Sequence, residues 1–149
     1  MTGSGSYSRL LGPEGPLARV IEGFESRREQ QLMADWVGET LESRGMLAIE
    51  AGTGTGKTYA YLVPALLSGK RVIIATGTKA LQDQLYHRDL PRIKQALSAP
   101  IHSALLKGRA NYLCIFRMHQ AKGETFVSRD VAQHFQRILQ WAGKTKRGD

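Results

Sequence analysis

The sequence predicts an α/β fold in which helices cover a parallel sheet. Three short apolar segments, rich in β-branched and aliphatic residues, predict buried strands at residues 46–51, 70–76 and 101–107. Segments with helical periodicity lie between them. This alternation of strand and helix is typical of a parallel sheet with helices on both faces. Three strands make a thin sheet, so we expect part of such a domain.

The first expected helix spans residues 27–43, where apolar residues recur every three or four positions. Ser26 and Glu29 fit a capping box at its start, with the serine as N-cap. Residues 56–68 predict a second helix. Pro64 lies inside that helix and is expected to kink it, because proline removes one backbone hydrogen bond.

Residues 79–87 and 92–98 predict two further helices, interrupted at Pro91. Ser128 is the expected N-cap of a last helix, on which apolar residues share one face.

Length and composition narrow the class of protein. The chain has 149 residues, about the size of one domain, and no apolar run is long enough to span a bilayer. Residues 1–19, rich in Gly, Ser and Pro, are expected to form a flexible lead-in. A single cysteine, Cys114, and the lack of an apolar signal segment predict a reducing, cytoplasmic setting.

The positive charge of the chain is unevenly distributed. The net charge is +8, yet residues 1–78 carry eight basic and eight acidic side chains. Residues 79–149 carry thirteen basic and five acidic side chains. Such an asymmetry favours a polyanion partner, with nucleic acid as the first candidate, although an ordinary basic surface is the alternative.

The most specific motif is the phosphate-binding loop "AGTGTGKT" at residues 51–58, placed between an expected strand and an expected helix. Its glycines let successive backbone N–H groups approach phosphate oxygens, and the helix N-terminus favours the same anion. The lysine provides a cation for the β- and γ-phosphates, and the last threonine provides a ligand for Mg²⁺. The expected nucleotide-binding residues are Gly52, Thr53, Gly54, Thr55, Gly56, Lys57 and Thr58.

A second acidic motif for hydrolysis is not visible, because no apolar run after residue 58 ends in Asp or Glu. The stretch "HRDL" at residues 87–90 imitates a kinase catalytic loop, but position 94 is Lys where that loop needs Asn. The four histidines show no zinc-ligand spacing.

Three other stretches accompany the phosphate loop: "RREQQLM" (27–33), "ATGTKALQDQL" (75–85) and "KGRANYLC" (107–114). Together and in this order they resemble the N-terminal part of DinG/YoaA-type ATP-dependent DNA helicases, in the XPD-like iron–sulfur branch of superfamily 2. The resemblance implies a partial RecA-like motor domain over residues 20–106. It also implies that an iron–sulfur insert begins within residues 107–149.

The resemblance also implies roles for single residues. Gln30, flanked by Arg27, would recognise adenine, although it is alternatively a polar residue on a helix surface, and Gln31 is adjacent. Residues of the "ATGTKALQDQL" stretch would contact phosphates of a single strand. Those residues are Thr76, Thr78 and Gln82, and Thr78 also fits a helix N-cap.

In these helicases the cysteine of "KGRANYLC" is the first ligand of a [4Fe–4S] cluster, which takes four thiolates. Cys114 would be that ligand, and in a full-length relative the other three would come later, outside these 149 residues. Judged by itself, a lone cysteine is most often a small buried residue. "TKRGD" at residues 145–149 resembles a Thr-x-x-Gly-Asp stretch of the same family.

The resemblance therefore implies an ATP- and Mg²⁺-dependent DNA helicase that moves 5′ to 3′ on single-stranded and forked DNA in repair or replication. The 149 residues alone are expected to bind nucleotide without hydrolysing it, because a second motor domain and the second acidic motif are missing. A small P-loop kinase or GTPase is a weaker alternative, since no Asn-Lys-x-Asp is present. The remaining alternative is a non-enzymatic stub that binds nucleotide and nucleic acid.

Overall fold

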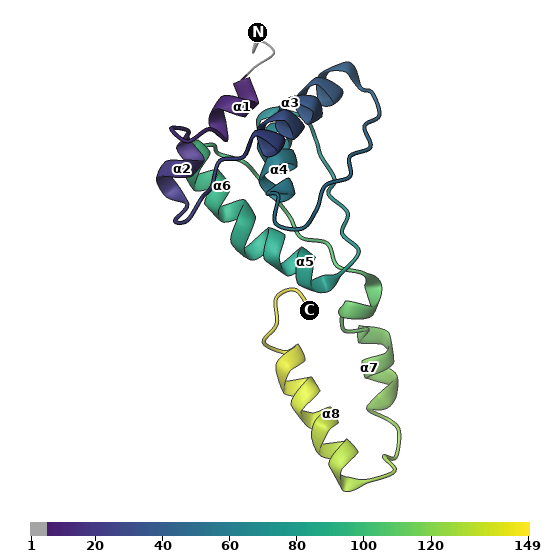
Figure 1. The fold of residues 1–149 in the computed structure, drawn as a ribbon. Coiled ribbons are helices and arrows are strands. Elements are labelled where there is room, and N and C mark those ends of the chain that lie inside the picture. Colours follow the sequence, from purple (N-terminus) through teal and green to yellow (C-terminus); the bar gives the residue numbers. More distant parts are fainter. Residues whose placement is uncertain (1–5) are drawn as a thin grey trace. The chain divides into compact units, whose positions relative to one another are not determined.

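The computed structural model describes residues 6–149, which fold as helices joined by turns and extended segments (Figure 1). The elements are α1 (Ser6–Leu10), α2 (Pro16–Val20), α3 (Arg28–Ser43), α4 (Lys57–Leu67), α5 (Lys79–Gln84), the π-helical turn η1 (Leu85–Asp89), α6 (Leu90–Leu97), the 3₁₀ turn η2 (Arg109–Asn111), α7 (Ile115–Ala121) and α8 (Arg129–Ala142). The chain divides into an N-terminal unit that ends at Ser103 and a C-terminal unit, Ala104–Asp149. Each unit is described by itself.

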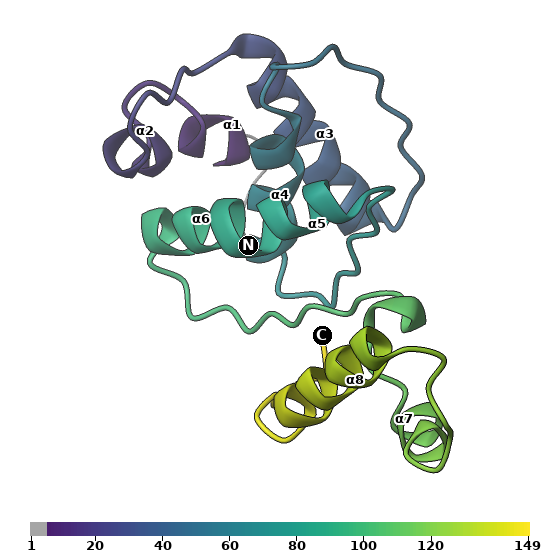
Figure 2. The same ribbon diagram turned by 90° about the horizontal axis from the view of Figure 1, so that it is seen from below.

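The expected parallel sheet is wrong for this chain, because no β-strand occurs within residues 6–149. Residues 46–51, 70–76 and 101–107 do not form β-strands, and in Figure 2 the segment between α3 and α4 loops away from the helices. Met46 and Ile73 are almost fully exposed. A buried strand needs neighbours on both edges and cover on both faces, and these segments have neither among the described residues.

The core of the N-terminal unit lies between helices. α3 packs along α4, α1 packs against α3, and α2 packs against α6 (Figure 1). The fully buried apolar residues are Leu11, Leu17, Ala34, Ala60, Leu62, Val63 and Ile93. Burial of each leucine contributes about 1.5–3 kcal/mol. This packing fixes the first turn of α3 beside the first turn of α4.

The N-terminal segment is part of that core. Residues 1–5 of the expected lead-in lie outside the described residues, but Leu11 and Leu17 are fully buried. A Cβ atom on Gly15 would lie 2.4 Å from the Leu10 carbonyl oxygen, so only glycine fits that close turn. The expectation of a flexible lead-in therefore does not hold from residue 6 onward.

The start of α3 differs from the expected capping box. The N-cap is Arg27, and no side chain caps the helix. The Ser26 hydroxyl instead accepts a hydrogen bond from Gln31 Nε2 at 2.6 Å. Ser26 thus links the segment before α3 to a side chain five residues later on that helix, and the sequence pattern does not distinguish this role from capping.

Neither proline ends its helix. α4 continues through Pro64, which is buried in the core. Pro91 is the second residue of α6 and comes directly after the π-helical turn η1. The preceding π-helical turn, in which Leu90 N–H donates to the Leu85 carbonyl, joins α6 to α5 without the expected interruption.

Two predicted N-caps are confirmed. Thr78 Oγ1 accepts from the Leu81 N–H at 3.2 Å at the start of α5. Ser128 Oγ accepts from the Val131 N–H at 3.3 Å at the start of α8.

The C-terminal unit contains no buried apolar residue among its helices. Its main aromatic contact joins Phe126 and Phe135, whose ring centroids lie 5.0 Å apart. Polar contacts therefore contribute more to the stability of the C-terminal unit than to that of the N-terminal unit.

In neither unit does a described helix have the length and apolar character needed to cross a membrane.

Candidate functional site

The phosphate-binding loop lies between an extended segment and the N-terminus of α4. Gly54 and Gly56 have φ values of +78° and +79°, in the left-handed region that favours glycine. The Thr55 hydroxyl donates to the Gly52 carbonyl at 3.0 Å and stiffens the turn. Lys57 is the first residue of α4, so the loop and its cation are placed at the positive end of a helix.

The Lys57 ammonium group is folded onto its own loop. It donates to the carbonyl oxygens of Ala51 and Gly52. The ammonium group therefore lies against the first residues of the loop and has carbonyl oxygens as its partners.

Gln30 brings the first turn of α3 into contact with this loop. Its side chain is 3% exposed, and its Nε2 donates to the Gly56 carbonyl at 3.0 Å. Its Oε1 is buried and has no hydrogen-bond partner within residues 6–149. An unpaired buried carbonyl is costly, by about 1–3 kcal/mol, and is therefore expected to have a partner in the working protein.

A cavity of about 250 Å³ opens at Gln30. Its lining includes Phe24, Arg27, Gln30, Gly54, Gly56 and Tyr59. The structure thus brings together residues from the segment before α3, from α3 itself and from the loop.

Two aromatic residues of this cavity were not among the residues expected from the sequence. The rings of Phe24 and Tyr59 lie 6.0 Å apart at an interplanar angle of 57° and provide an apolar surface beside Gln30. Arg92 of α6 also lines the cavity. Tyr59 could have been predicted, because it directly follows the phosphate-binding motif in the sequence. The sequence around Phe24 and Arg92 contains no pattern that predicts their place in the cavity.

Arg27 connects the two sides of the cavity. Its guanidinium group donates to the Gly54 carbonyl and forms a 2.7 Å ion pair with Glu25. Both side chains of the ion pair are substantially exposed, so the pair adds little stability by itself.

Thr58 and Tyr61 lie three residues apart on α4, and their side chains share a hydrogen bond. Burial raises the pKa of Tyr61, a hydrogen bond with the Thr58 side chain lowers it, and the charge of Asp89 raises it further. The carboxylate of Asp89 is 2% exposed and accepts from Arg88 Nε at 2.9 Å and Gln84 Nε2 at 3.0 Å. The "HRDL" stretch therefore lies in a continuous helical segment with its aspartate in a structural contact.

The expected nucleic-acid residues lie at the start of α5. Thr76 Oγ1 donates to the Thr78 carbonyl at 3.3 Å. Thr78 uses its oxygen as a capping acceptor, which leaves its hydroxyl proton able to point toward a phosphate. Gln82 follows on α5 and is half-buried.

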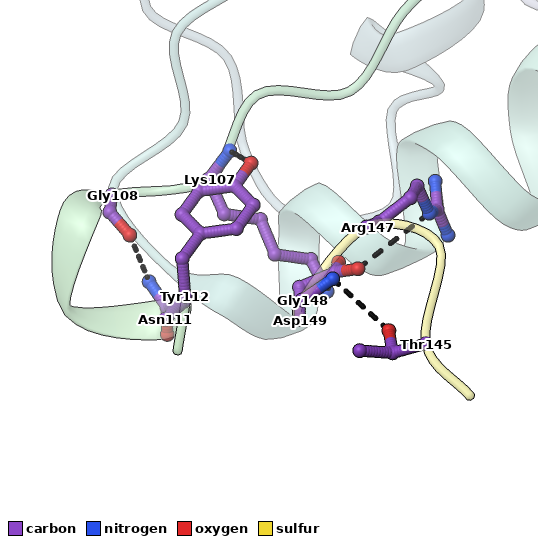
Figure 3. Close-up of polar contacts among 8 residues, drawn as sticks. All are labelled: Lys107, Gly108, Asn111, Tyr112, Thr145, Arg147, Gly148 and Asp149. Atoms are coloured by element: carbon purple, nitrogen blue, oxygen red, sulfur yellow. Dashed lines mark hydrogen bonds and ion pairs between the residues drawn. The ribbon is translucent and has the colours of Figure 1, made fainter. Parts of the chain in front are cut away.

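Cys114 belongs to the C-terminal unit, where it directly precedes α7, and its thiol is free and exposed. The turn before it is held by two hydrogen bonds (Figure 3): the Lys107 N–H donates to Tyr112 Oη at 2.9 Å, and Asn111 Nδ2 donates to the Gly108 carbonyl at 3.1 Å. No group of three or more His, Cys, Asp or Glu within residues 6–149 could hold a metal ion. The described residues therefore do not form a complete [4Fe–4S] site, which requires four thiolates.

A glycine-rich loop that leads into a helix with Lys-Thr at its first positions places the chain among P-loop proteins. Residues 30–122 match the DEAD/DEAH box helicase family, and the chain belongs to this family. The resemblance to DinG/YoaA-type helicases is confirmed by similarity to several relatives. No solved structure matches the chain.

The chain is 50% identical over 95% of its length to the ATP-dependent DNA helicase YoaA of Haemophilus influenzae, of which it covers 22%. It is 49% identical over 93% of its length to the ATP-dependent DNA helicase YoaA of Escherichia coli, again covering 22%. It is 34% identical over 93% of its length to the 3′-5′ exonuclease DinG of Bacillus subtilis, of which it covers 15%. The chain thus spans about a fifth of the length of the YoaA relatives that it matches.

Proposed function

We propose that the chain is the adenine- and phosphate-binding part of an ATP-dependent DNA helicase. The observation that carries this proposal is the position of Gln30, which lines a cavity shared with the phosphate-binding loop and whose buried Oε1 has no partner within residues 6–149. The names of the YoaA relatives support the activity.

Adenine is the base whose edge matches this site. A glutamine amide pairs with adenine in bidentate fashion, accepting from the N6 amine and donating to N7. Gln30 Oε1 would accept from the N6 amine. Gln30 Nε2 would donate to N7 in place of its present bond to the Gly56 carbonyl. Phe24 and Tyr59 would cover the base.

The phosphates would lie over residues 52–58. Lys57 would exchange its bonds to the loop carbonyls for bonds to the β- and γ-phosphates. Thr58 would provide a hydroxyl ligand to Mg²⁺, whose charge would stabilise the transferred phosphoryl group.

Single-stranded DNA, including the single strand of a fork, would contact Thr76, Thr78 and Gln82 through its phosphates, independently of sequence. The charge distribution favours a polyanion partner, because the C-terminal unit carries nine Lys/Arg against three Asp/Glu. In this proposal residues 20–106 are part of the first motor domain and residues 107–149 begin an insert.

The finer features of the proposal rest on the family resemblance. They are movement from 5′ to 3′, a role in repair or replication, and a cytoplasmic location. Cys114 would supply one thiolate to a [4Fe–4S] cluster whose other three ligands lie outside these 149 residues.

The test is equilibrium binding of fluorescent ATP and GTP analogues to the 149-residue chain, with and without Mg²⁺. We expect ATP to bind more tightly than GTP, and Lys57→Ala to weaken both nucleotides. Equal affinity for the two nucleotides would argue against adenine recognition. Binding that Lys57→Ala leaves unchanged would contradict the proposed phosphate site.

A further inference from the structure

Two stretches of the C-terminal unit that are far apart in the sequence lie together (Figure 3). One is the "KGRANYL" turn at residues 107–113, before Cys114. The other is the "TKRGD" stretch at residues 145–149, to which the proposed function gives no role. Between them the chain forms α7 and α8 and then returns to its starting point.

The contact between the two stretches has a side-chain part and a backbone part. Lys107 Nζ and Asp149 Oδ2 form an ion pair at 2.7 Å, and the other carboxylate oxygen of Asp149 lies 3.5 Å from Arg147 Nε. The Leu113 N–H donates to the Gly148 carbonyl at 2.8 Å. The ion pair with Lys107 and the backbone bond join four residues that we call the clasp: Lys107, Leu113, Gly148 and Asp149.

The local conformation of the second stretch is built to present this carbonyl. Gly148 has a φ of +75°, which favours glycine, and its N–H donates to Thr145 Oγ1 at 3.0 Å. The threonine therefore fixes the turn in which Gly148 faces Leu113. Gly148 and Asp149 of the Thr-x-x-Gly-Asp pattern belong to the clasp, and Thr145 holds the turn that contains Gly148.

Exposure distinguishes the two cations that contact Asp149. The side chain of Asp149 is 8% exposed and that of Lys107 is 24% exposed, whereas that of Arg147 is 59% exposed. The shorter distance and the lower exposure make Lys107 the principal partner. The C-terminal unit has no buried apolar residue that could hold its two ends together instead.

We propose that Asp149 is a positioning residue that closes the C-terminal unit: by pairing with Lys107 it holds the Gly148 carbonyl against the Leu113 N–H and so fixes the segment that presents Cys114. The segment that contains α7 and α8 then begins and ends at the clasp. The orientation of the backbone that leads from the clasp into Cys114 is set by residues outside both helices. This inference does not depend on what the Cys114 thiol binds.

Amide hydrogen exchange of Leu113, measured by NMR on the full 149-residue chain, tests the proposal. Every chain compared carries a Gly-Ser extension after Asp149, so that an α-carboxylate at that position does not replace the side chain. We expect Asp149→Asn to accelerate exchange of the Leu113 amide about tenfold or more. Arg147→Gln, which removes the exposed cation, is the matched control and should leave the exchange rate within twofold.

A charge swap separates pairing from a general loss of structure. Lys107→Asp should accelerate Leu113 exchange as Asp149→Asn does, and the double variant Lys107→Asp/Asp149→Lys should restore most of the protection. Amides inside α8 report whether the unit stays folded. Unchanged Leu113 exchange in Asp149→Asn would overturn the proposal, as would an equal effect of Arg147→Gln or a double variant that shows no recovery.

Discussion

Gln30 Nε2 donates a hydrogen bond to the Gly56 carbonyl at 3.0 Å across 26 residues of sequence. This bond joins the first turn of α3 to the N-cap of α4, while Gln30 Oε1 is buried and has no hydrogen-bond partner within residues 6–149. Gln30 thus contacts the phosphate-binding loop and also lines the cavity beside it. The base and phosphate parts of the proposed site are thus coupled through one side chain.

Gln30→Ala is expected to weaken ATP binding about tenfold, because loss of one to two hydrogen bonds costs about 1.4 kcal/mol. GTP binding should change less, so that the preference for ATP declines. Competition titration of a fluorescent nucleotide measures both affinities.

The matched control is Gln31→Ala, since Gln31 bonds to Ser26 Oγ and the Leu11 carbonyl and does not line the cavity. It should lower stability slightly and preserve the ratio of ATP to GTP affinity. If the two variants lose ATP selectivity equally, Gln30 is not the adenine-reading residue.

Gly56→Ala should damage both loop and cavity. A Cβ atom there would lie 2.1 Å from Gln30 Nε2, and φ at Gly56 is +79°. The left-handed conformation alone costs about 1–2 kcal/mol in a residue with a side chain. We expect a lower Tm by several degrees and weaker ATP binding, measured by thermal denaturation with and without nucleotide.

Gly52→Ala is the comparison for stability, because a Cβ atom at Gly52 meets nothing within 4 Å. Its Tm should stay close to that of the parent chain. A Gly56→Ala chain with unchanged Tm would show that the contact between Gln30 and Gly56 is not formed in solution.

The conformation of the phosphate-binding loop was more predictable than the fold, and the reason is physical. The residues of the phosphate-binding loop carry their chemistry locally: glycines at positive φ and a lysine at a helix N-terminus can be identified from adjacent positions. Likewise, the N-caps Thr78 and Ser128 depend on a bond to a residue three positions ahead, so their local patterns predict them correctly.

The strands could not be predicted from their apolar composition, because a strand depends on partners elsewhere in the chain. Ile73 and Met46 have the composition of buried strands but are exposed and unpaired. Ser26 is a second example, since its hydroxyl bonds to the Gln31 side chain, five residues later, instead of capping α3. Phe24 and Arg92 reach the cavity through packing of α2, α3 and α6, which no local pattern reports.

The 149-residue chain is expected to show no ATP turnover stimulated by single-stranded DNA. Asp89, a buried acid of the N-terminal unit, accepts hydrogen bonds from Gln84 and Arg88 in a structural contact. No apolar run after residue 58 ends in an acid that could hold Mg²⁺ and orient water. A coupled phosphate-release assay with and without oligonucleotide provides the measurement. Turnover that disappears in Lys57→Ala would refute this expectation.

Neutralising α8 should weaken binding to a single strand. Arg129 and Arg137 share one exposed face of α8 with three glutamines, Gln133, Gln136 and Gln140, and with no carboxylate. Arg129→Gln/Arg137→Gln should lower affinity and reduce the salt slope by about 1.4, since each phosphate contact on a single strand contributes about 0.7. Fluorescence anisotropy of a labelled oligonucleotide at several salt concentrations gives both values.

Arg9→Gln/Arg19→Gln removes the same charge from exposed positions of the N-terminal unit and is the control for net charge. Its salt slope should stay near that of the parent chain. Equal losses in both double variants would mean that affinity follows total charge rather than the basic face of α8.

Acid should open the clasp by protonating Asp149. A hydrogen bond from Lys107 lowers the pKa of the Asp149 carboxyl, as do the charges of Lys107 and Arg147, while burial opposes the shift. Because the folded-state pKa is below the unfolded value of about 3.9, the contribution of Asp149 to stability is fully present above that value. It is lost as pH falls through the lowered folded-state pKa, so exchange of the Leu113 amide should accelerate, relative to its intrinsic rate, over the same range.

The ¹³Cγ chemical shift of Asp149, followed by NMR titration of the chain extended after Asp149, measures this pKa directly. Lys107→Gln should move the pKa of Asp149 up toward its ordinary value, because it removes the cationic hydrogen-bond donor that lowers this pKa most. Arg147→Gln should have a smaller effect, since Arg147 lies farther from the carboxylate and is more exposed. High salt should reduce the contribution of Arg147 more than that of Lys107, because an exposed charge is screened more strongly than a partly buried one. A titration midpoint that Lys107→Gln leaves in place would show that the pair between Lys107 and Asp149 does not form in solution.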